Sequence, residues 1–165
     1  MELAVGGSTL YAGALCLAMM ATGRGRRASP PAFVRSWLPI APLALVYAAL
    51  LAASWQPDTL PILLPGSLAD GLRGGFRPQF FPSVNGVSRL FAREMTAASL
   101  WVHILAVNVA SARWMWLQYF AGRLSRLACV VCVGISAVFA PVGLLLALAL
   151  LPSDAMAAEE GGELG

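Results

Sequence analysis

The sequence predicts an all-α integral membrane protein, a four-helix bundle that forms a single membrane domain over residues 1–165. Of its residues, 59% are apolar and only 12% are charged, whereas a soluble domain usually carries about 25% charged residues. Four apolar stretches, at about 3–22, 37–55, 95–120 and 127–151, reach the roughly 20 residues that a bilayer crossing needs. Because backbone groups in lipid must be satisfied within the protein, each stretch should be a helix.

The first two spans carry small residues four positions apart, such as Ala14 with Ala18 and Ala48 with Ala52. This spacing lets helix backbones approach closely in lipid. A long connection rich in Pro and Gly, residues 56–94, follows the second span. Its last part, SVNGVSRLFARE, predicts an amphipathic helix, which would lie at the membrane interface or pack over the end of the bundle. The apolar face of that helix consists of Val84, Val87, Leu90 and Phe91.

The third span holds three polar residues that lipid disfavours, His103, Asn108 and Arg113. Arg113 could anchor the helix at the interface, His103 could bond to another helix as a neutral imidazole, and Asn108 could join two helices. By helical phase, His103 shares a face with Trp114, and Trp101 shares another with Asn108. An imidazole beside an aromatic wall suits a flat conjugated ligand, and His103 could be the axial ligand of a chlorophyll magnesium.

The fourth span contains Pro141, which predicts a kink near the freed carbonyl of Ala137. An acidic tail, residues 152–165, follows it. The three cysteines lie in apolar runs, which favours buried small side chains. The CxxC spacing of one pair leaves a redox or metal role as the alternative. These cysteines are Cys16, Cys129 and Cys132.

Charge predicts the orientation. The two short loops contain basic but no acidic residues, so they should face the cytoplasm or stroma by the positive-inside rule. Four crossings would then place both termini on the outer or lumenal side. The basic residues do not form one stripe, which argues against a nucleic-acid partner. The arginines of the short loops are Arg24, Arg26, Arg27, Arg35, Arg123 and Arg126.

The tract from Ser83 to Phe120, followed by FAPVGLLLALAL, resembles the abscisic-acid-deficient-four family of small plastid and cyanobacterial membrane proteins linked to neoxanthin synthesis. The resemblance is good over about residues 83–151 and rests elsewhere on layout alone. The positions that match the family pattern are Trp101, Val102, His103, Leu105, Ala106, Arg113, Trp114, Phe139, Pro141, Gly143, Leu144 and Leu145.

Two departures from the family pattern bear on activity. Its two aspartate positions are Asn108 and Gln118 in this chain, and a glycine position is Ala112. Opening a violaxanthin epoxide to an allene needs proton transfers, and an amide cannot titrate to perform them. An enzyme built on this chain would therefore depend on His103, so the sequence favours binding over catalysis.

The sequence thus predicts a thylakoid membrane subunit that packs among photosystem and antenna proteins and holds chlorophyll or carotenoid without catalysis. The alternatives are a carotenoid-modifying enzyme of the neoxanthin-synthase type and a pigment-free membrane scaffold. The predicted pigment-binding residues are His103, Asn108, Arg113, Trp114, Trp101 and Gln118.

Overall fold

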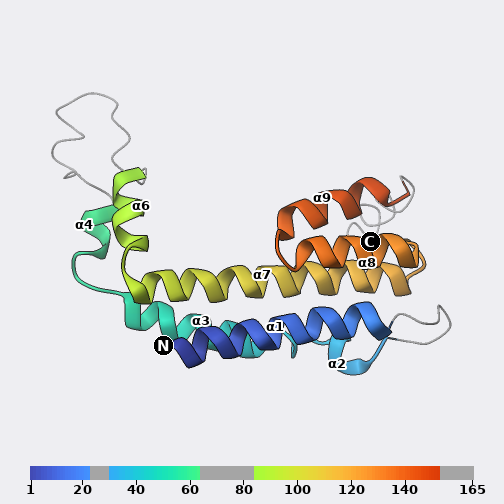
Figure 1. Cartoon of the computed structure of the whole chain (residues 1–165), viewed down its shortest axis with the longest axis horizontal. Helices are drawn as coiled ribbons and strands as arrows, with labels where there is room; N and C mark the ends of the chain where they lie inside the picture. The colour runs from blue at the N-terminus through green and yellow to red at the C-terminus, as the bar shows by residue number, and fades with distance from the viewer. Residues whose placement is uncertain (23–29, 64–83, 153–165) are drawn as a thin grey trace, which may run out of the picture.

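The computed structural model describes residues 1–22, 30–63 and 84–152, which form eight α-helices and no strand (Figure 1). The predicted all-α class is confirmed for this part of the chain. The acidic tail and most of the Pro- and Gly-rich connection lie outside the described residues. One long helix lies at the centre of the fold, and most of the other helices pack against it.

The long helix is α7 (Glu94–Phe120), whose 27 residues give a length of about 40 Å. Helix α1 (Glu2–Thr22) lies alongside it, and α3 (Ala41–Ser54) packs on it as well (Figure 1). Among the described helices, only α1 and α7 have the length and apolar composition to cross a membrane. The predicted four-span bundle is therefore not confirmed, although its first and third spans correspond to real long helices.

The second predicted span is shorter than expected. Helix α3 begins at Ala41 and has 14 residues, or about 21 Å, whereas a hydrocarbon core is about 30 Å thick. Proline explains the late start, because Pro39 and Pro42 lack the N–H that a helix interior requires. Upstream, the chain forms only a short helix, α2 (Ala32–Arg35), and a turn.

The fourth predicted span, residues 127–151, is wrong as a single crossing. The chain forms two helices, α8 (Arg126–Ser136) and α9 (Ala140–Leu150), that lie side by side as a hairpin over the second half of α7 (Figure 1). Each has 11 residues, or about 16 Å. Pro141 at the start of α9 accordingly accompanies a reversal of the chain and not a kink.

The hairpin also changes the predicted topology. Helix α9 runs back toward the end of the bundle where α7 ends, which is the end opposite the start of α1 (Figure 1). The prediction that four crossings return the chain to its starting side therefore fails at Leu150. Four described arginines lie near this end, in or beside the short segments that join the helices, and they are Arg35, Arg113, Arg123 and Arg126.

Local signals explain the turn that precedes the hairpin. Gly122, which follows α7, has a φ of 77°, a left-handed conformation that glycine adopts without strain. Three residues later the Ser125 side chain accepts the Ala128 N–H at 3.2 Å and so caps the first turn of α8. The chain therefore reverses within five residues, which brings α8 back onto α7.

The predicted amphipathic helix is confirmed as α6 (Val84–Phe91). It packs against α4 (Thr59–Leu63) and stands steeply to α7, to one side of the bundle's end (Figure 1). Arg93 donates to Asp58 at 2.6 Å between the two segments, and this hydrogen bond lowers the pKa of the Asp58 carboxyl. If α7 lies along a membrane normal, α6 lies in the membrane plane, which favours the interfacial alternative.

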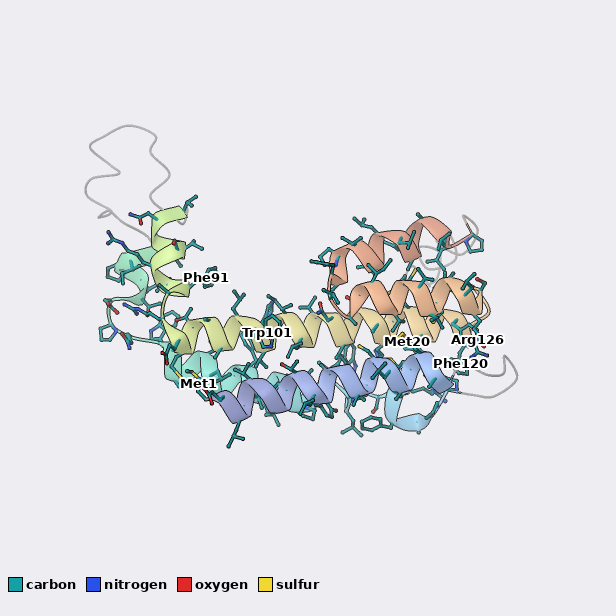
Figure 2. The ribbon with its side chains drawn as sticks, viewed as in Figure 1. Met1, Met20, Phe91, Trp101, Phe120 and Arg126 are labelled. Atoms are coloured by element: carbon teal, nitrogen blue, oxygen red, sulfur yellow. The ribbon has the colours of Figure 1, made fainter. Side chains whose placement is uncertain are left out.

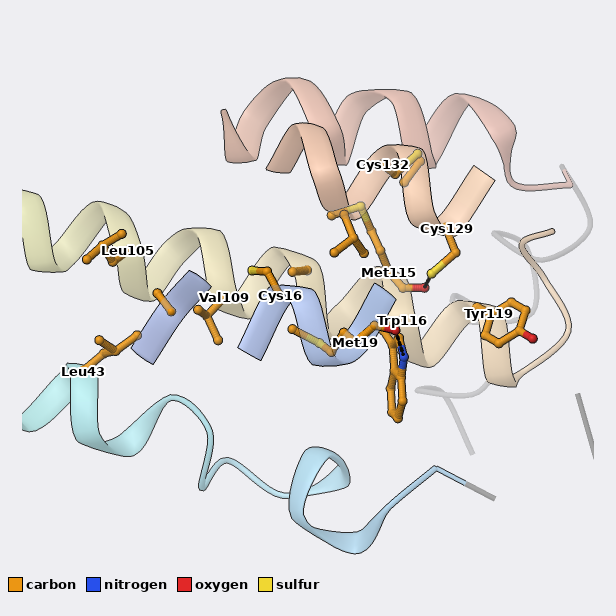
Figure 3. Close-up of a cluster of buried hydrophobic side chains, with 14 of the residues drawn as sticks. Cys16, Met19, Leu43, Leu105, Val109, Met115, Trp116, Tyr119, Cys129 and Cys132 are labelled. Atoms are coloured by element: carbon orange, nitrogen blue, oxygen red, sulfur yellow. Dashed lines mark hydrogen bonds between the residues drawn. The ribbon is translucent and has the colours of Figure 1, made fainter. Parts of the chain in front are cut away.

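The buried core lies between α1, α3, α7 and α8 (Figure 3). Trp116 is its largest buried side chain, and its indole N–H donates to the Met19 carbonyl at 2.9 Å. Cys16, Cys129 and Cys132 are all buried and free. The prediction that the cysteines fill the core as small side chains is therefore confirmed.

Helices α8 and α9 of the hairpin approach each other closely at Gly143. A Cβ at Gly143 would lie 2.6 Å from the Cys132 carbonyl oxygen and 2.7 Å from the Ser136 nitrogen. Because backbone atoms cannot move aside cheaply, Gly143→Ala should lower the free energy of unfolding by about 1–3 kcal/mol. The measurement is thermal or denaturant unfolding in detergent micelles.

The matched control is Gly134→Ala on the facing helix α8, where a Cβ would meet only the Met20 sulfur at an ordinary 3.8 Å. That variant should be at least as stable as the parent protein, because Ala is favoured over Gly in a helix. Equal stability of the two variants would mean that α9 does not approach α8 as the structure shows.

Candidate functional site

The candidate site is a cleft where the tip of the hairpin meets α1 and α7. It has a volume of about 220 Å³ and lies beside the midpoint of α7. Three elements contribute to it: the middle of α1, the first half of α7 and the turn between α8 and α9. The lining residues are Thr9, Ala12, Gly13, Cys16, Trp101, Ile104, Leu105, Asn108, Ala137 and Val138.

Trp101 forms one wall of the cleft and is fixed by a hydrogen bond between α7 and α1. Its indole N–H donates to the Thr9 hydroxyl at 2.9 Å. The Thr9 hydroxyl donates in turn to the Val5 carbonyl at 2.7 Å. An indole N–H in an apolar setting needs a partner, so this chain of bonds holds the ring in one orientation against the cleft.

Asn108 forms the inner end of the cleft and holds the hairpin tip. Its amide Nδ2 donates to the Ala137 carbonyl at 3.0 Å, and the Ser136 hydroxyl lies 3.5 Å from the Asn108 carbonyl oxygen. Ala137 caps the C-terminal end of α8, where helix carbonyls lose their partners. The Asn108 amide therefore satisfies an acceptor that the reversal of the chain would otherwise leave unpaired.

The cleft is chemically an apolar pocket with a few polar groups at its edge. Drug-sized ligands occupy pockets of roughly 300–1,000 Å³, so this cleft, at about 220 Å³, is too small to enclose a whole ligand of that size. Cys16 is its only titratable side chain among the described lining residues, and no carboxyl or imidazole lines it. The arrangement suits binding and orientation better than proton transfer.

His103 lies away from this cleft. Its ring contacts Tyr47 of α3 with centroids 5.0 Å apart, and its side chain is exposed. The imidazole makes no hydrogen bond with any described residue. It is therefore open to an external ligand, but the structure does not bring it together with Trp101 or Asn108.

Arg113 is bonded to the backbone of another segment. Its Nε donates to the carbonyls of Val34 at 2.7 Å and Ser36 at 3.1 Å, and its Nη2 donates to that of Arg35 at 2.6 Å. The guanidinium also stacks on the ring of Trp37 at 4.7 Å. Arg113 thus caps the C-terminal end of α2 and fastens it to α7.

The other two predicted site residues lie farther along α7. Trp114 is half-buried against the core, and Gln118 is 7% exposed, with its carbonyl oxygen 3.3 Å from the Arg123 guanidinium. Neither lines the cleft. Pigment binding by them, by His103 and by Arg113 stays a prediction, whereas the expected shared face of Trp101 and Asn108 agrees with the structure.

Reasoning from the sequence missed the contributions of Thr9, Gly13 and the Ala137–Val138 turn. One signal for Thr9 existed, because the indole of Trp101 needs an acceptor at the same depth of a neighbouring helix. Nothing in the sequence marks Ala137 and Val138, because only the unexpected hairpin brings them to the cleft. Among the described residues, no cluster of three or more His, Cys, Asp or Glu side chains could hold a metal ion.

Fold and site together define a small all-helical protein with two helices of membrane-crossing length and an apolar cleft between them. The chain belongs to the ABA DEFICIENT 4-like family, whose model matches residues 7–146. This confirms the family resemblance found in the sequence.

One relative is Protein ABA DEFICIENT 4, chloroplastic, from Arabidopsis thaliana, which is 29% identical over 112 residues. The match covers 68% of this chain and 44% of the relative, so the chain aligns with less than half of that protein's length. No solved structure matches the chain.

The bonding of Arg113 gives a second prediction. Arg113→Lys replaces a fork of donors by one ammonium, which cannot reach the same three carbonyls. We expect the free energy of unfolding to fall by about 1.5–3 kcal/mol, the usual contribution of hydrogen bonds to charged groups. Denaturant unfolding followed by tryptophan fluorescence measures it, with the exposed Arg126→Lys as control. Equal loss in both variants would contradict a special role for Arg113.

A third prediction concerns the hairpin tip. Asn108→Leu removes the donor to the Ala137 carbonyl, and an unpaired buried acceptor costs about 1–3 kcal/mol. We expect amide hydrogen exchange in α8 and α9 to be faster in this variant than in the parent protein, while exchange in α1 stays the same. The control is Asn85→Leu, which changes an exposed residue of α6 and should leave exchange in α8 and α9 unchanged. Unaltered exchange in the Asn108 variant would show that the amide does not hold the tip.

Proposed function

We propose that the protein is a plastid membrane protein that binds a carotenoid, with one end ring of the carotenoid in the cleft at Asn108. The observation that carries the proposal is the cleft itself, an apolar space bounded by an aromatic ring and an amide at the midpoint of the longest helix. A carotenoid end ring is apolar and carries at most a few oxygens, which the amide edge could bond.

The comparisons support the location and the ligand class. The relative from Arabidopsis thaliana is chloroplastic by name, and the family resemblance connects chains of this kind to neoxanthin synthesis. The outer faces of the helices agree with a lipid environment, because large apolar side chains are exposed along several of them. Examples are Leu3, Leu10, Leu17, Leu45, Leu127 and Leu145, which are 64% to 92% exposed.

Binding without conversion is the preferred form of the proposal. A conversion of the epoxide to an allene needs a group that donates or removes a proton within reach of the ligand. The described lining of the cleft offers the Asn108 amide where the family pattern has an aspartate, and His103 lies on another face. The carotenoid-modifying enzyme is the second candidate, supported by the family resemblance.

Chlorophyll at His103, and packing of the protein among photosystem and antenna subunits, remain predictions. The exposed imidazole beside Tyr47 is compatible with an external ligand. A pigment-free membrane scaffold is the remaining alternative, and the test below distinguishes it from a carotenoid-binding protein.

The test uses glycines of α1 that have open space beside them. Gly13 lines the cleft, and a Cβ there would meet nothing within 4 Å. Gly13→Leu should therefore fill the cleft without disturbing the helix, in which Leu is favoured over Gly. With the protein in nanodiscs, we expect retention of a xanthophyll to fall about tenfold, measured by absorption and chromatography of the extracted pigment.

Gly7→Leu is the matched control, because Gly7 lines a separate hollow between α1 and α3 and also has open space around it. It should retain the xanthophyll like the parent protein. No retention by the parent would favour the scaffold. A neoxanthin product from violaxanthin that disappears with Gly13→Leu would establish the enzyme.

A further inference from the structure

Acidic and basic side chains are separated along the bundle. The carboxylates of the described residues lie near the end where α1 and α7 begin, which Met1 and Phe91 mark in Figure 2. Four arginines lie toward the opposite end, which Phe120 and Arg126 mark, and no described Asp or Glu accompanies them there. The carboxylates belong to Glu2, Asp58 and Glu94, and the arginines are Arg35, Arg113, Arg123 and Arg126.

Two of these four arginines are bonded within the protein, and two are not. Arg113 donates to three carbonyls of α2 and the segment after it, and Arg123 donates to Gln118. Arg35 and Arg126 are exposed, and their guanidinium groups make no hydrogen bond or ion pair with any described residue. Because Arg113 already satisfies the last carbonyls of α2, the Arg35 side chain is not needed to cap its own helix.

Large apolar side chains next to these two free arginines are also exposed. Those in the α2 segment, beside Arg35, and the one that follows Arg126 are 46% to 75% exposed. Exposed aromatic and apolar side chains beside arginine are typical of the boundary between lipid headgroups and hydrocarbon. A soluble anion would contact only the charges, whereas a lipid would contact both the charges and the apolar groups. These apolar residues are Phe33, Trp37, Leu38 and Leu127.

We propose that this end of the protein binds the headgroups of anionic bilayer lipids through Arg35 and Arg126. A guanidinium recognises a phosphate oxygen pair with two parallel hydrogen bonds. The exposed apolar side chains would contact the acyl chains of the same lipid. One arginine near a membrane surface strengthens the attraction to anionic lipid about fivefold. The inference is independent of carotenoid binding, because neither arginine lines the cleft.

Lipids that differ in headgroup charge provide the test. The full chain is reconstituted in vesicles of equal parts phosphatidylcholine and phosphatidylglycerol, extracted in mild detergent, and its retained lipids are counted by mass spectrometry. We expect the parent protein to retain phosphatidylglycerol in excess. Arg35→Gln and Arg126→Gln should each lower the ratio of retained phosphatidylglycerol to phosphatidylcholine about fivefold. Excess soluble glycerol phosphate should not displace the lipid, because it has no acyl chains.

The matched control is Arg89→Gln, which removes an exposed arginine of α6 at the end that holds the carboxylates. It should change the ratio by less than about twofold, because the nearby negative charges already oppose anionic lipid there. Thermal unfolding in phosphatidylcholine alone should be the same for the parent and all three variants. Arg35→Lys, which keeps the charge, should retain most of the preference for phosphatidylglycerol.

Four outcomes would overturn the inference. Equal retention of the two lipids by the parent protein would show that the arginines do not select a headgroup. An equal effect of Arg89→Gln and Arg35→Gln would show that the two ends do not differ. Displacement of the lipid by glycerol phosphate would mean that the arginines bind a soluble anion. Binding of soluble polyglutamate without a lipid preference would mean that this end contacts an acidic protein segment.

Discussion

The hydrogen bond from the Asn108 amide to the Ala137 carbonyl supports the rest of this structure. It lies where an apolar chain reverses beside the midpoint of a helix of about 40 Å. Backbone groups exposed by such a reversal need hydrogen-bond partners, which a chain surrounded by lipid would find only within the protein. One amide on α7 supplies the partner, and Pro141 at the start of α9 removes a donor that would otherwise need one. The hairpin therefore ends at that depth and leaves half of α7 uncovered, and the cleft forms at its tip.

The polar side chains of α7 make different contacts in the structure, although in the sequence each is simply a polar residue in an apolar stretch. Arg113 fastens α2 through three carbonyls, and Trp101 reaches across to Thr9. Asn108 holds the hairpin tip. Each of these side chains is satisfied by the protein itself, so its presence in the sequence does not by itself require a ligand. His103 differs, since its imidazole has only an aromatic neighbour among the described residues.

The sequence predicted the elements whose signals are local. Helix α6 followed from its apolar face, the long third span became α7, and the cysteines proved to be buried. The fourth span could not be predicted correctly, because a continuous apolar stretch of sufficient length has the same composition whether it crosses once or folds back. The distinguishing contacts, Asn108 with Ala137 and Gly143 with Cys132, join positions that only the folded chain brings together. For the same reason, Trp101 and Asn108 could be placed on one face, but the Ala137–Val138 wall opposite them could not.

The Asn108 amide bears both on how the hairpin is held and on whether the cleft can transfer a proton. The family resemblance implies an aspartate at this position, and an ionised carboxylate cannot donate to the Ala137 carbonyl as the Asn108 amide does. With asparagine, the hairpin tip is held by a side chain that does not titrate. An amide does not exchange a proton with a ligand as a carboxyl group can. On the proposed function, such a chain would hold a carotenoid end ring in a cleft whose described lining contains no carboxyl group.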